Sequence, residues 1–395
     1  MLHTYRRLIL PVYLPSLMTS VAQSATAILL PLYMLSLGHS VAAASFIVAM
    51  RGIGLLLTDI PAGLIANRFG DKTSMLVGYL TMMIALVLLS ISDHQGVIVL
   101  AAALTGTSMS FALLGRMSYI TDSVAGEERG RALALMAGLQ RAGSLLGPLI
   151  FGAIAKHFSY ETTFAVMACL LIIAVLSVAI FAVHHEIPHR RQVPLTAMFG
   201  IFIRYKKILL TVGLGGLCLM MVRNARILLF PLVGHSIGMD AVQIGMLFSL
   251  SSVVDMLMFY PAGQIMDNVG RKWTAVPGIL VLSLSLLLLA LFPSMTGMLI
   301  FTILSGLGNG ITTGVLVTIG SDVAPDVERG QFLGIWRLQN DLGYSASPLL
   351  VGALSNIASL SVAAMCISGV GLAGAAVFVF LMEETLTRKQ NLSQN

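Results

Sequence analysis

The sequence predicts an all-α membrane protein with twelve transmembrane helices in two parallel six-helix repeats. Three observations support this fold class. First, 57% of the 395 residues are hydrophobic and only 10% are charged, with a mean hydropathy of +0.92, so polar side chains are too few to cover a soluble globule. Second, long apolar runs follow one another along the chain. Third, polar, glycine and proline positions recur after a shift of 200 residues, which indicates an internal duplication.

The apolar runs define the predicted helices. Each has about 20 residues or more, which suffices to cross about 30 Å of hydrocarbon at about 1.5 Å per residue. Repeats separated by an even number of spans share one orientation, so the two halves are expected to be parallel. The predicted spans are 9–37, 41–66, 73–92, 96–121, 130–156, 160–183, 208–236, 241–266, 273–292, 296–321, 331–356 and 359–382.

The distribution of basic residues predicts the orientation. The connections alternate between very short and charged ones, and positive charge resists translocation across the membrane. We therefore expect a multi-pass protein of the plasma (inner) membrane with both termini in the cytoplasm. Lys156 is the one exception on the outer side. The cytoplasmic set comprises Arg6, Arg7, Arg68, Lys72, Arg129, Arg131, Arg190, Arg191, Arg204, Lys206, Lys207, Arg271, Lys272, Arg329, Arg388 and Lys389.

One long polar connection divides the chain. Residues 184–207 contain two prolines, Pro188 and Pro194, and several of the basic residues. We therefore predict an N-terminal six-helix bundle at 1–183, a cytoplasmic linker at 184–207, and a C-terminal six-helix bundle with a short cytoplasmic tail at 208–395. The net charge of +6 comes from cations at loop positions that set topology, so we expect no nucleic-acid partner.

Two polar stretches with the same spacing follow the second span of each half. Hydrocarbon does not accommodate such stretches, so each is predicted to be a short loop at a membrane face. Other positions repeat with the same shift, including Pro31 with Pro231 and Asp122 with Asp322. The two stretches read Gly63-Leu-Ile-Ala-Asn67-Arg68-Phe-Gly70-Asp71-Lys72 and Gly263-Gln-Ile-Met-Asp267-Asn268-Val-Gly270-Arg271-Lys272.

These stretches resemble the Gly-x-x-x-Asp-Arg-x-Gly-Arg-Lys loop signature of the major facilitator superfamily (MFS), and the resemblance extends over essentially the whole chain. The fifth span also resembles the antiporter motif of the drug:proton antiporter branch with twelve spans. Asn67 and Phe151 depart from the family pattern, because the family has aspartate and glycine there. The antiporter-like motif is Gly143-x-x-x-Gly147-Pro148-x-x-x-Gly152.

The resemblance implies a gating role for the repeated stretches. In the family, the loop arginine and aspartate hold the inner ends of helices together in the outward-open state, with an acid at the end of the fourth helix as partner. The gating residues implied in this way are Gly63, Asn67, Arg68, Gly70 and Asp122 in the first half, and Gly263, Asp267, Gly270, Arg271 and Asp322 in the second.

Charged residues inside the predicted spans are the strongest functional signal. Each costs about 2.5–3.5 kcal/mol or more at a helix centre, so each is expected to face a cavity or a partner. Asp59 and Arg116 are shallow, and snorkelling, pairing with the loop motif and cavity lining are all open for them. The deeper Arg51 also lies within a span. The predicted substrate and proton cavity comprises Gln23, Gln140, Arg141, Arg223, Asn224, Arg226, Asp255, Arg337, Asn340 and Asp341.

The two deep acids have two possible roles. A buried carboxylate can exchange a proton as its exposure changes, so Asp255 and Asp341 are candidate proton carriers. Alternatively they permanently neutralise arginines, since Arg337 and Asp341 are four residues apart on one helix. Guanidinium groups suit carboxylate or phosphate, which favours an anionic or zwitterionic amphipathic substrate.

These residues and the family resemblance predict a secondary active transporter. We expect proton-coupled efflux of a small organic, anionic or amphipathic molecule by alternating access. An uptake symporter or uniporter of the same fold, and a non-transporting receptor or scaffold, are the alternatives. Nucleotide-binding and hydrolase motifs are absent, so no enzyme activity and no cofactor are expected. Cys169, Cys218 and Cys366 lack metal-ligand spacing, so no metal is expected. The expected partners are the substrate, protons and the lipid bilayer, with the chain acting as a monomer.

Overall fold

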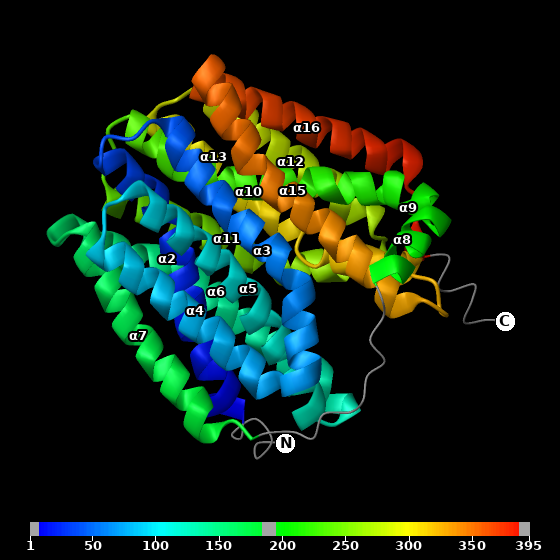
Figure 1. The fold of residues 1–395 in the computed structure, drawn as a ribbon. Helices are drawn as coiled ribbons and strands as arrows, with labels where there is room; N and C mark the ends of the chain where they lie inside the picture. The colour runs from blue at the N-terminus through cyan, green and yellow to red at the C-terminus, as the bar shows by residue number, and fades with distance from the viewer. Residues whose placement is uncertain (1–7, 184–194, 387–395) are drawn as a thin grey trace. The chain divides into compact units, whose positions relative to one another are not determined.

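The computed structural model describes residues 8–183 and 195–386, and no β-strand occurs in that part of the chain. Figure 1 labels most of its helices. Their bounds are η1 Ile9–Tyr13, a π-helix, α2 Leu14–Ser36, α3 Val41–Phe69, α4 Asp71–Ile91, α5 Gln95–Ser123, α6 Gly126–His157, α7 Tyr160–Phe181, α8 Leu195–Arg204, α9 Lys206–Leu210, α10 Val212–Ser236, α11 Ala241–Asn268, α12 Lys272–Leu291, α13 Met295–Ile311, α14 Val315–Val323, α15 Arg329–Ile357 and α16 Leu360–Leu381.

Eleven helices, or pairs of consecutive helices, in the described residues are long and apolar enough to cross a membrane. They cover every predicted span except the eleventh, 331–356. That span does form a helix, α15, which has 29 residues and is therefore long enough. Its high content of polar residues, including Arg337 and Asp341, keeps α15 out of the apolar set. The protein is thus a multi-pass membrane protein in which the eleventh predicted span, helix α15, is unusually polar.

The chain packs as two compact units. One contains Met1–Gln192 together with Met239–Ser249, and the other contains Val193–Gly238 together with Leu250–Asn395. The predicted linker, 184–207, falls partly outside the described residues, because 184–194 are not described. Its remainder contains α8 and the start of α9. In this second unit, α10 packs against α15 and α16, and α12 packs against α13 and α16 (Figure 1).

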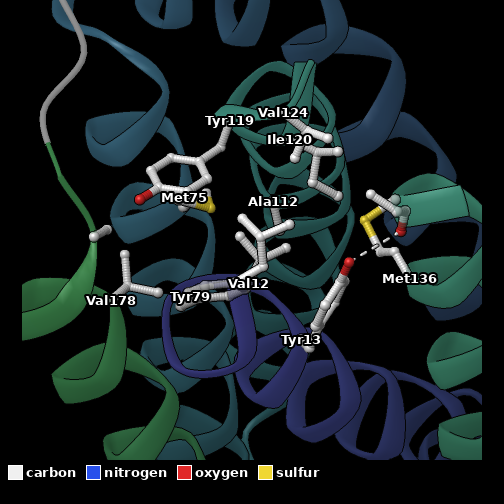
Figure 2. Packing of buried hydrophobic residues seen from close by; sticks show 13 residues of the cluster. Val12, Tyr13, Met75, Tyr79, Ala112, Tyr119, Ile120, Val124, Met136 and Val178 are labelled. Carbon is white, nitrogen blue, oxygen red and sulfur yellow. Dashed lines mark hydrogen bonds between the residues drawn. The ribbon is translucent and has the colours of Figure 1, made fainter. Parts of the chain in front are cut away.

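Apolar side chains tie five elements of the first unit together near the start of the chain. Figure 2 shows Val12 and Tyr13 of η1 among side chains of α4, α5, α6 and α7. The Tyr13 hydroxyl donates to the Ala132 carbonyl oxygen at 3.5 Å. Tyr79 of α4 is completely buried in this cluster. Membrane helices associate through close packing and hydrogen bonds, so this cluster anchors this end of the unit.

The repeated polar stretches are mostly helical, so the prediction of two loops was wrong in extent. Helix α3 continues through Gly63 and ends at Phe69, and α11 continues to Asn268. Gly70, with φ of 87°, and Gly270, with φ of 142°, break the chain there, because only glycine adopts such conformations readily. A helix satisfies its own backbone groups, so the polar side chains extend α3 and α11 rather than ending them.

The tenth predicted span, 296–321, is broken in two. Helix α13 ends at Ile311 and α14 begins at Val315, after Gly314 in the left-handed conformation with φ of 77°. Threonines at 312 and 313 precede this glycine, and the Thr312 hydroxyl donates to carbonyls of α13 at 3.0 and 3.1 Å. Threonine side chains that bond to the backbone compete with helix continuation, which accounts for a break that hydropathy did not reveal.

Candidate functional site

The second unit contains a polar network that connects the middle of α10 and of α11 to the last turn of α13. The Arg223 Nε of α10 donates to Asn309 Oδ1 of α13 at 2.8 Å. The Asn309 Nδ2 in turn donates to Asp255 Oδ1 of α11 at 3.0 Å. The Thr313 hydroxyl lies 3.4 Å from the same carboxylate oxygen. The Asn309 amide therefore connects the Arg223 guanidinium to the Asp255 carboxylate through two hydrogen bonds. The sequence had indicated Arg223 and Asp255 separately.

A second guanidinium lies beside this network. Arg226 is 7% exposed, and its Nη1 donates to the Ser305 carbonyl oxygen at 3.1 Å and to Ser251 Oγ at 3.3 Å. It also interacts electrostatically with Asp255 and Arg223. Hydrogen bonds to a charged group contribute about 1.5–3 kcal/mol each. These contacts therefore offset part of the cost of burying Arg226.

The other predicted cavity residues of this unit lie on α15 or contact it. Arg337 Nε lies 3.3 Å from Asp341 Oδ2, one helical turn away. Asn224 of α10 is buried and donates to the Tyr344 carbonyl oxygen at 2.6 Å. The Asn340 Nδ2 bonds within α15 to the Trp336 carbonyl at 2.9 Å. Asn224 thus fastens α10 to α15, and the Arg337–Asp341 pair lies on one helix.

In the first unit, the predicted cavity residues lie on α2 and α6. The Ser20 hydroxyl donates to the Gln140 carbonyl oxygen at 2.6 Å, which fastens these two helices. Arg141, the next residue, is partly buried. On the other side of α2, Arg51 of α3 reaches the Gln23 carbonyl oxygen, with Nη2 at 3.5 Å. Gln23 is therefore adjacent to an arginine that was not included in the predicted cavity.

The antiporter-like motif lies on α6 and makes close contacts. A side chain at Gly143 would come within 2.6 Å of the Ser20 side chain, and one at Gly147 would meet the Val21 carbonyl of α2. Pro148 is inside the helix. Gly152 approaches the Ala241 carbonyl, with 2.8 Å left for a Cβ. Small residues therefore allow these backbones to approach closely, as they commonly do between membrane helices.

Of the predicted gating residues of the first unit, Asn67, Arg68 and Asp122 are exposed, Gly63 is partly buried and Gly70 is buried. Asn67 and Arg68 lie on the last turn of α3, and the Arg68 guanidinium carbon is 5.3 Å from the centroid of the Phe69 ring. Among the described residues, Arg68 forms no ion pair with Asp122, whose Oδ2 accepts from Ser118 at 3.4 Å. A side chain at Gly63 would meet open space, so packing does not require glycine there.

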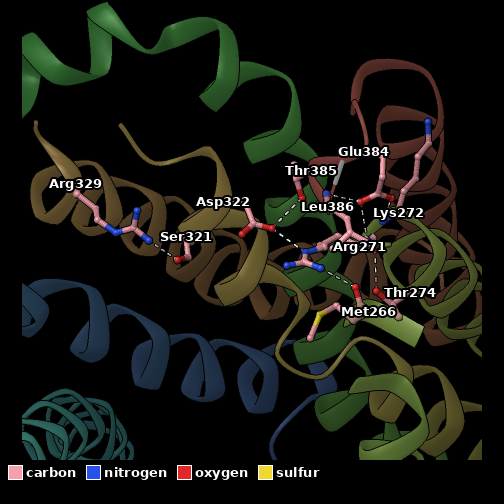
Figure 3. A network of polar contacts seen from close by, with 10 residues as sticks. All are labelled: Met266, Arg271, Lys272, Thr274, Ser321, Asp322, Arg329, Glu384, Thr385 and Leu386. Atoms are coloured by element: carbon pink, nitrogen blue, oxygen red, sulfur yellow. Dashed lines mark hydrogen bonds and ion pairs between the residues drawn. The ribbon is translucent and has the colours of Figure 1, made fainter. Parts of the chain in front are cut away.

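The matching region of the second unit is buried and densely bonded (Figure 3). Arg271 Nε lies 2.7 Å from Asp322 Oδ2, and the side chains are only 6% and 4% exposed. The Arg271 Nη1 also donates to the Met266 carbonyl at 2.8 Å. Thr385 donates to the same Asp322 oxygen at 3.0 Å. The predicted residues Gly263 and Asp267 lie outside this network, on the last turns of α11, and Asp267 is exposed.

Glu384 completes this network from the segment after α16. Its carboxylate accepts from the backbone N–H groups of Arg271 and Lys272 at 2.9 and 3.1 Å. These N–H groups open helix α12, where a carboxylate is stabilised by both hydrogen bonds and the helix dipole. In the first unit Asp71 has the corresponding role, since Asp71 Oδ1 accepts from the Lys72 N–H at 2.8 Å.

The two shallow charges contact other interior groups of the first unit. Asp59 Oδ1 accepts from the Ser110 hydroxyl at 2.5 Å. Arg116 is 3% exposed and lies close to the Tyr79 hydroxyl of α4. Both contacts are made to neighbouring helices of the unit, so snorkelling toward a membrane face gains no support from them.

Sequence reasoning missed several residues of these networks. Asn309, Thr313, Ser251 and Ser305 are neutral and have no charged neighbour in the sequence, so the search around charges inside spans passed over them. Asn309 had a detectable signal, because the matching residue after a shift of 200 is Met109. Glu384 was counted with the tail, although its two hydrogen bonds to α12 make it part of this buried network.

Comparison with known proteins defines the class. The family model of the Major Facilitator Superfamily matches residues 12–222 and 212–395. Multidrug resistance protein MdtH of Yersinia pestis (strain Pestoides F) is 20% identical over 297 residues, which cover 75% of this chain and 72% of that protein. The same protein of Yersinia pseudotuberculosis serotype O:1b (strain IP 31758) matches equally. The chain belongs to the major facilitator superfamily and is a membrane transporter of that class.

Solved structures of transporters share the fold. A POT family transporter crystallised with 5-aminolevulinic acid has a TM-score of 0.79 at 11% identity, covering 93% of this chain and 94% of that one. A mutant of the nucleoside transporter NupG also has a TM-score of 0.79, at 14% identity, covering 95% of this chain and 100% of that one. These likenesses show that the chain has the fold of these membrane transporters.

Proposed function

We propose that this transporter is a proton-coupled exporter of a small organic molecule that carries an anionic group and a hydrogen-bond donor, as an amphipathic acid or zwitterion does. The single observation that carries the proposal is the Arg223–Asn309–Asp255 network, which joins the middle of α10 and of α11 to the last turn of α13. Burying a carboxylate and guanidinium groups inside the membrane is costly, so charged groups at this depth mark a functional site. Substrate sites of such transporters lie near the bilayer midplane.

Proton exchange at Asp255 is the proposed coupling step. Asn309 and Thr313 donate to Oδ1 of this carboxylate. A substrate donor group that takes a place at the carboxylate competes with a proton for it, so the proton leaves when the substrate binds. A purely anionic substrate would do the opposite, because a nearby anion favours the protonated form of Asp255. Export by exchange therefore requires the donor group as well as the anion.

Asp341 is the less suitable acid. Its Oδ2 is 3.3 Å from the Arg337 Nε on the same helix. The Arg337 guanidinium therefore gives Asp341 an ion-pair partner on its own helix. We assign Asp341 and Arg337 a structural ion pair within α15 and leave the proton to Asp255. The two aspartates are therefore matched test positions, both in the second half and both within predicted spans.

Transport in proteoliposomes tests this assignment. A panel of zwitterionic, anionic and cationic compounds is screened for substrate-dependent pH change and for substrate exchange. For a transported compound, Asp255→Asn should reduce gradient-driven transport by more than about tenfold. The same variant should still exchange substrate across the membrane. Asp341→Asn should instead reduce the amount of folded protein, because it removes the carboxylate that pairs with Arg337 inside the membrane. Full coupling in a folded Asp255→Asn protein would refute the proposed carrier.

The proposed orientation places both termini and residues 184–207 on the cytoplasmic side of a bacterial-type inner membrane. The basic residues support it, since the positive-inside bias is strong, and the sequence similarity to MdtH is consistent with export. We propose that one chain forms the complete transporter. A single cysteine at position 192 should be labelled only after the membrane is permeabilised. Labelling of intact cells at that position would reverse the topology.

A further inference from the structure

Arg51 is a buried arginine that the proposed coupling step does not use. It is 7% exposed and lies ten residues into α3, about 15 Å along the helix axis. Its one hydrogen bond among the described residues is a long one, from Nη2 to the Gln23 carbonyl oxygen at 3.5 Å. The Arg51 Nε is buried and has no hydrogen-bond partner among those residues.

Gln23 is in the same condition on the facing helix. Its Nε2 is buried and donates to no acceptor in the described part of the chain. Gln23 lies near the middle of α2, thirteen residues before Ser36. Two buried donors on adjacent helices, one of them on a guanidinium, therefore lack acceptors, which destabilises the protein unless a ligand supplies them.

The neighbouring charged groups of this unit do not supply the acceptor. Asp59, on the same helix as Arg51, is two turns away and accepts from Ser110. No acidic side chain forms an ion pair with Arg51 among the described residues. The other intramembrane charges of the unit, Arg116 and Arg141, are cations. An anionic ligand is the group that would satisfy both donors.

The repeat explains why the acceptor is missing. After a shift of 200, Arg51 corresponds to Ser251 and Gln23 corresponds to Arg223. In the second half, Arg223 and Arg226 of α10 bond to Ser251 of α11 and to Ser305 and Asn309 of α13. Asp255 of α11 supplies a negative charge to the same network. The first-half counterparts of Asp255 and Asn309 are Leu55 and Met109. The duplicated interface thus keeps an arginine and lacks the carboxylate.

We propose that Arg51 and Gln23 form an oxyanion site in the first half, which binds the carboxylate or phosphate-type group of a ligand through Arg51 Nε and Gln23 Nε2. The proposal rests on the proposed function only for the source of the ligand, which is the transported substrate. It adds Arg51 to the predicted cavity residues of the first half and gives Arg51 and Gln23 a role in specificity.

The Gln23→Glu variant is the sharpest test. It places a carboxylate beside Arg51 and so supplies the missing acceptor from within the chain. In purified protein without ligand, Gln23→Glu should raise the melting temperature by about 2 °C or more. It should also abolish ligand binding at the site, because the new carboxylate occupies Arg51. Gln95→Glu is the matched control, since it adds the same charge at the exposed start of α5.

Ligand binding is followed by thermal shift with sodium benzoate, phenyl phosphate, neutral benzamide and sodium chloride at constant ionic strength. Benzoate or phenyl phosphate should stabilise the wild type and Gln95→Glu, whereas benzamide should not. The shift should be lost, with affinity reduced more than about tenfold, in Gln23→Glu and in Arg51→Gln. Arg51→Gln should fold without difficulty, since it removes an uncompensated buried charge.

Three results would overturn the site. These are the absence of any oxyanion shift in the wild type, an equal shift in Arg51→Gln, and stabilisation by chloride alone. A lower melting temperature of Gln23→Glu would contradict the missing acceptor. None of these measurements uses a proton gradient or Asp255, so their failure leaves the transport assay of the proposed function intact. Conversely, loss of coupling in that assay says nothing about the oxyanion shift.

Discussion

The two halves of the chain place arginines at the same helix interface and at the same repeated stretch, yet they surround them differently. In the second half, Arg223 and Arg226 bond to serine, asparagine and a backbone carbonyl, with Asp255 in the same network. In the first half, Arg51 meets one carbonyl at 3.5 Å. The duplication therefore preserved the helices and changed the polar chemistry within them.

The repeated stretches differ in the same sense. Arg271 of the second half is buried against Asp322, and its backbone N–H donates to the Glu384 carboxylate. Arg68 of the first half, in contrast, is exposed and lies over the Phe69 ring. The lysine that follows is equivalent in both: Lys72 Nζ bonds to carbonyls at the end of α7, and Lys272 Nζ to those at the end of α16. A lysine near the end of a helix stabilises its last carbonyls. That part of the repeat therefore supports the fold, and the arginine is the part that diverged.

The largest expected effect separates the two arginines. Arg271→Ala leaves Asp322 buried without its cation, which should destabilise the protein by about 3–5 kcal/mol. Arg68→Ala removes an exposed side chain and should change stability by less than about 0.5 kcal/mol. Heat or denaturant unfolding in detergent measures both. Equal losses of stability would show that the two stretches are equivalent after all.

Much of this asymmetry follows from features that a sequence does not display. Hydropathy and the 200-residue shift predicted the helices, the repeat and the buried charges, because these depend on long apolar runs and on single residue types. The amide of Asn309, the break at Thr312 and the cap from Glu384 depend on which atoms meet across helices. The shift of 200 marks Asn309 as a departure from Met109, but it does not show which atoms the asparagine meets, so its partners could not be inferred.

Exchanging residues between halves sharpens the comparison of the polar networks. Asn309→Met gives the second half the first-half residue and removes the link between Arg223 and Asp255. Proton-driven transport should fall by at least about tenfold, because two charge-assisted hydrogen bonds are lost. Met109→Asn is the matched exchange in the first half, where no such link exists to be lost. A similar fall in both variants would mean that helix packing, and not the network, is being measured.

The smallest expected effect concerns the cap of α12. Glu384→Gln removes the charge that accepts from two backbone N–H groups, and should cost about 0.5–2 kcal/mol of stability. Glu383→Gln removes the same charge from the adjacent, exposed side chain and should be near neutral. Thermal unfolding of the two variants side by side gives the difference. If Glu383→Gln were the more damaging change, the C-terminal segment would act through overall charge and not through the cap.

The central claim is that the second half exchanges a proton at Asp255 when substrate binds. The most direct test is the proton released to a weakly buffered, dye-containing solution when purified protein binds a compound identified in the transport panel. Binding should release protons from the wild type near neutral pH. The Asp255→Asn protein should bind the compound and release none. Equal release from both proteins, or proton uptake by the wild type, would contradict the account, and uptake would identify a symporter.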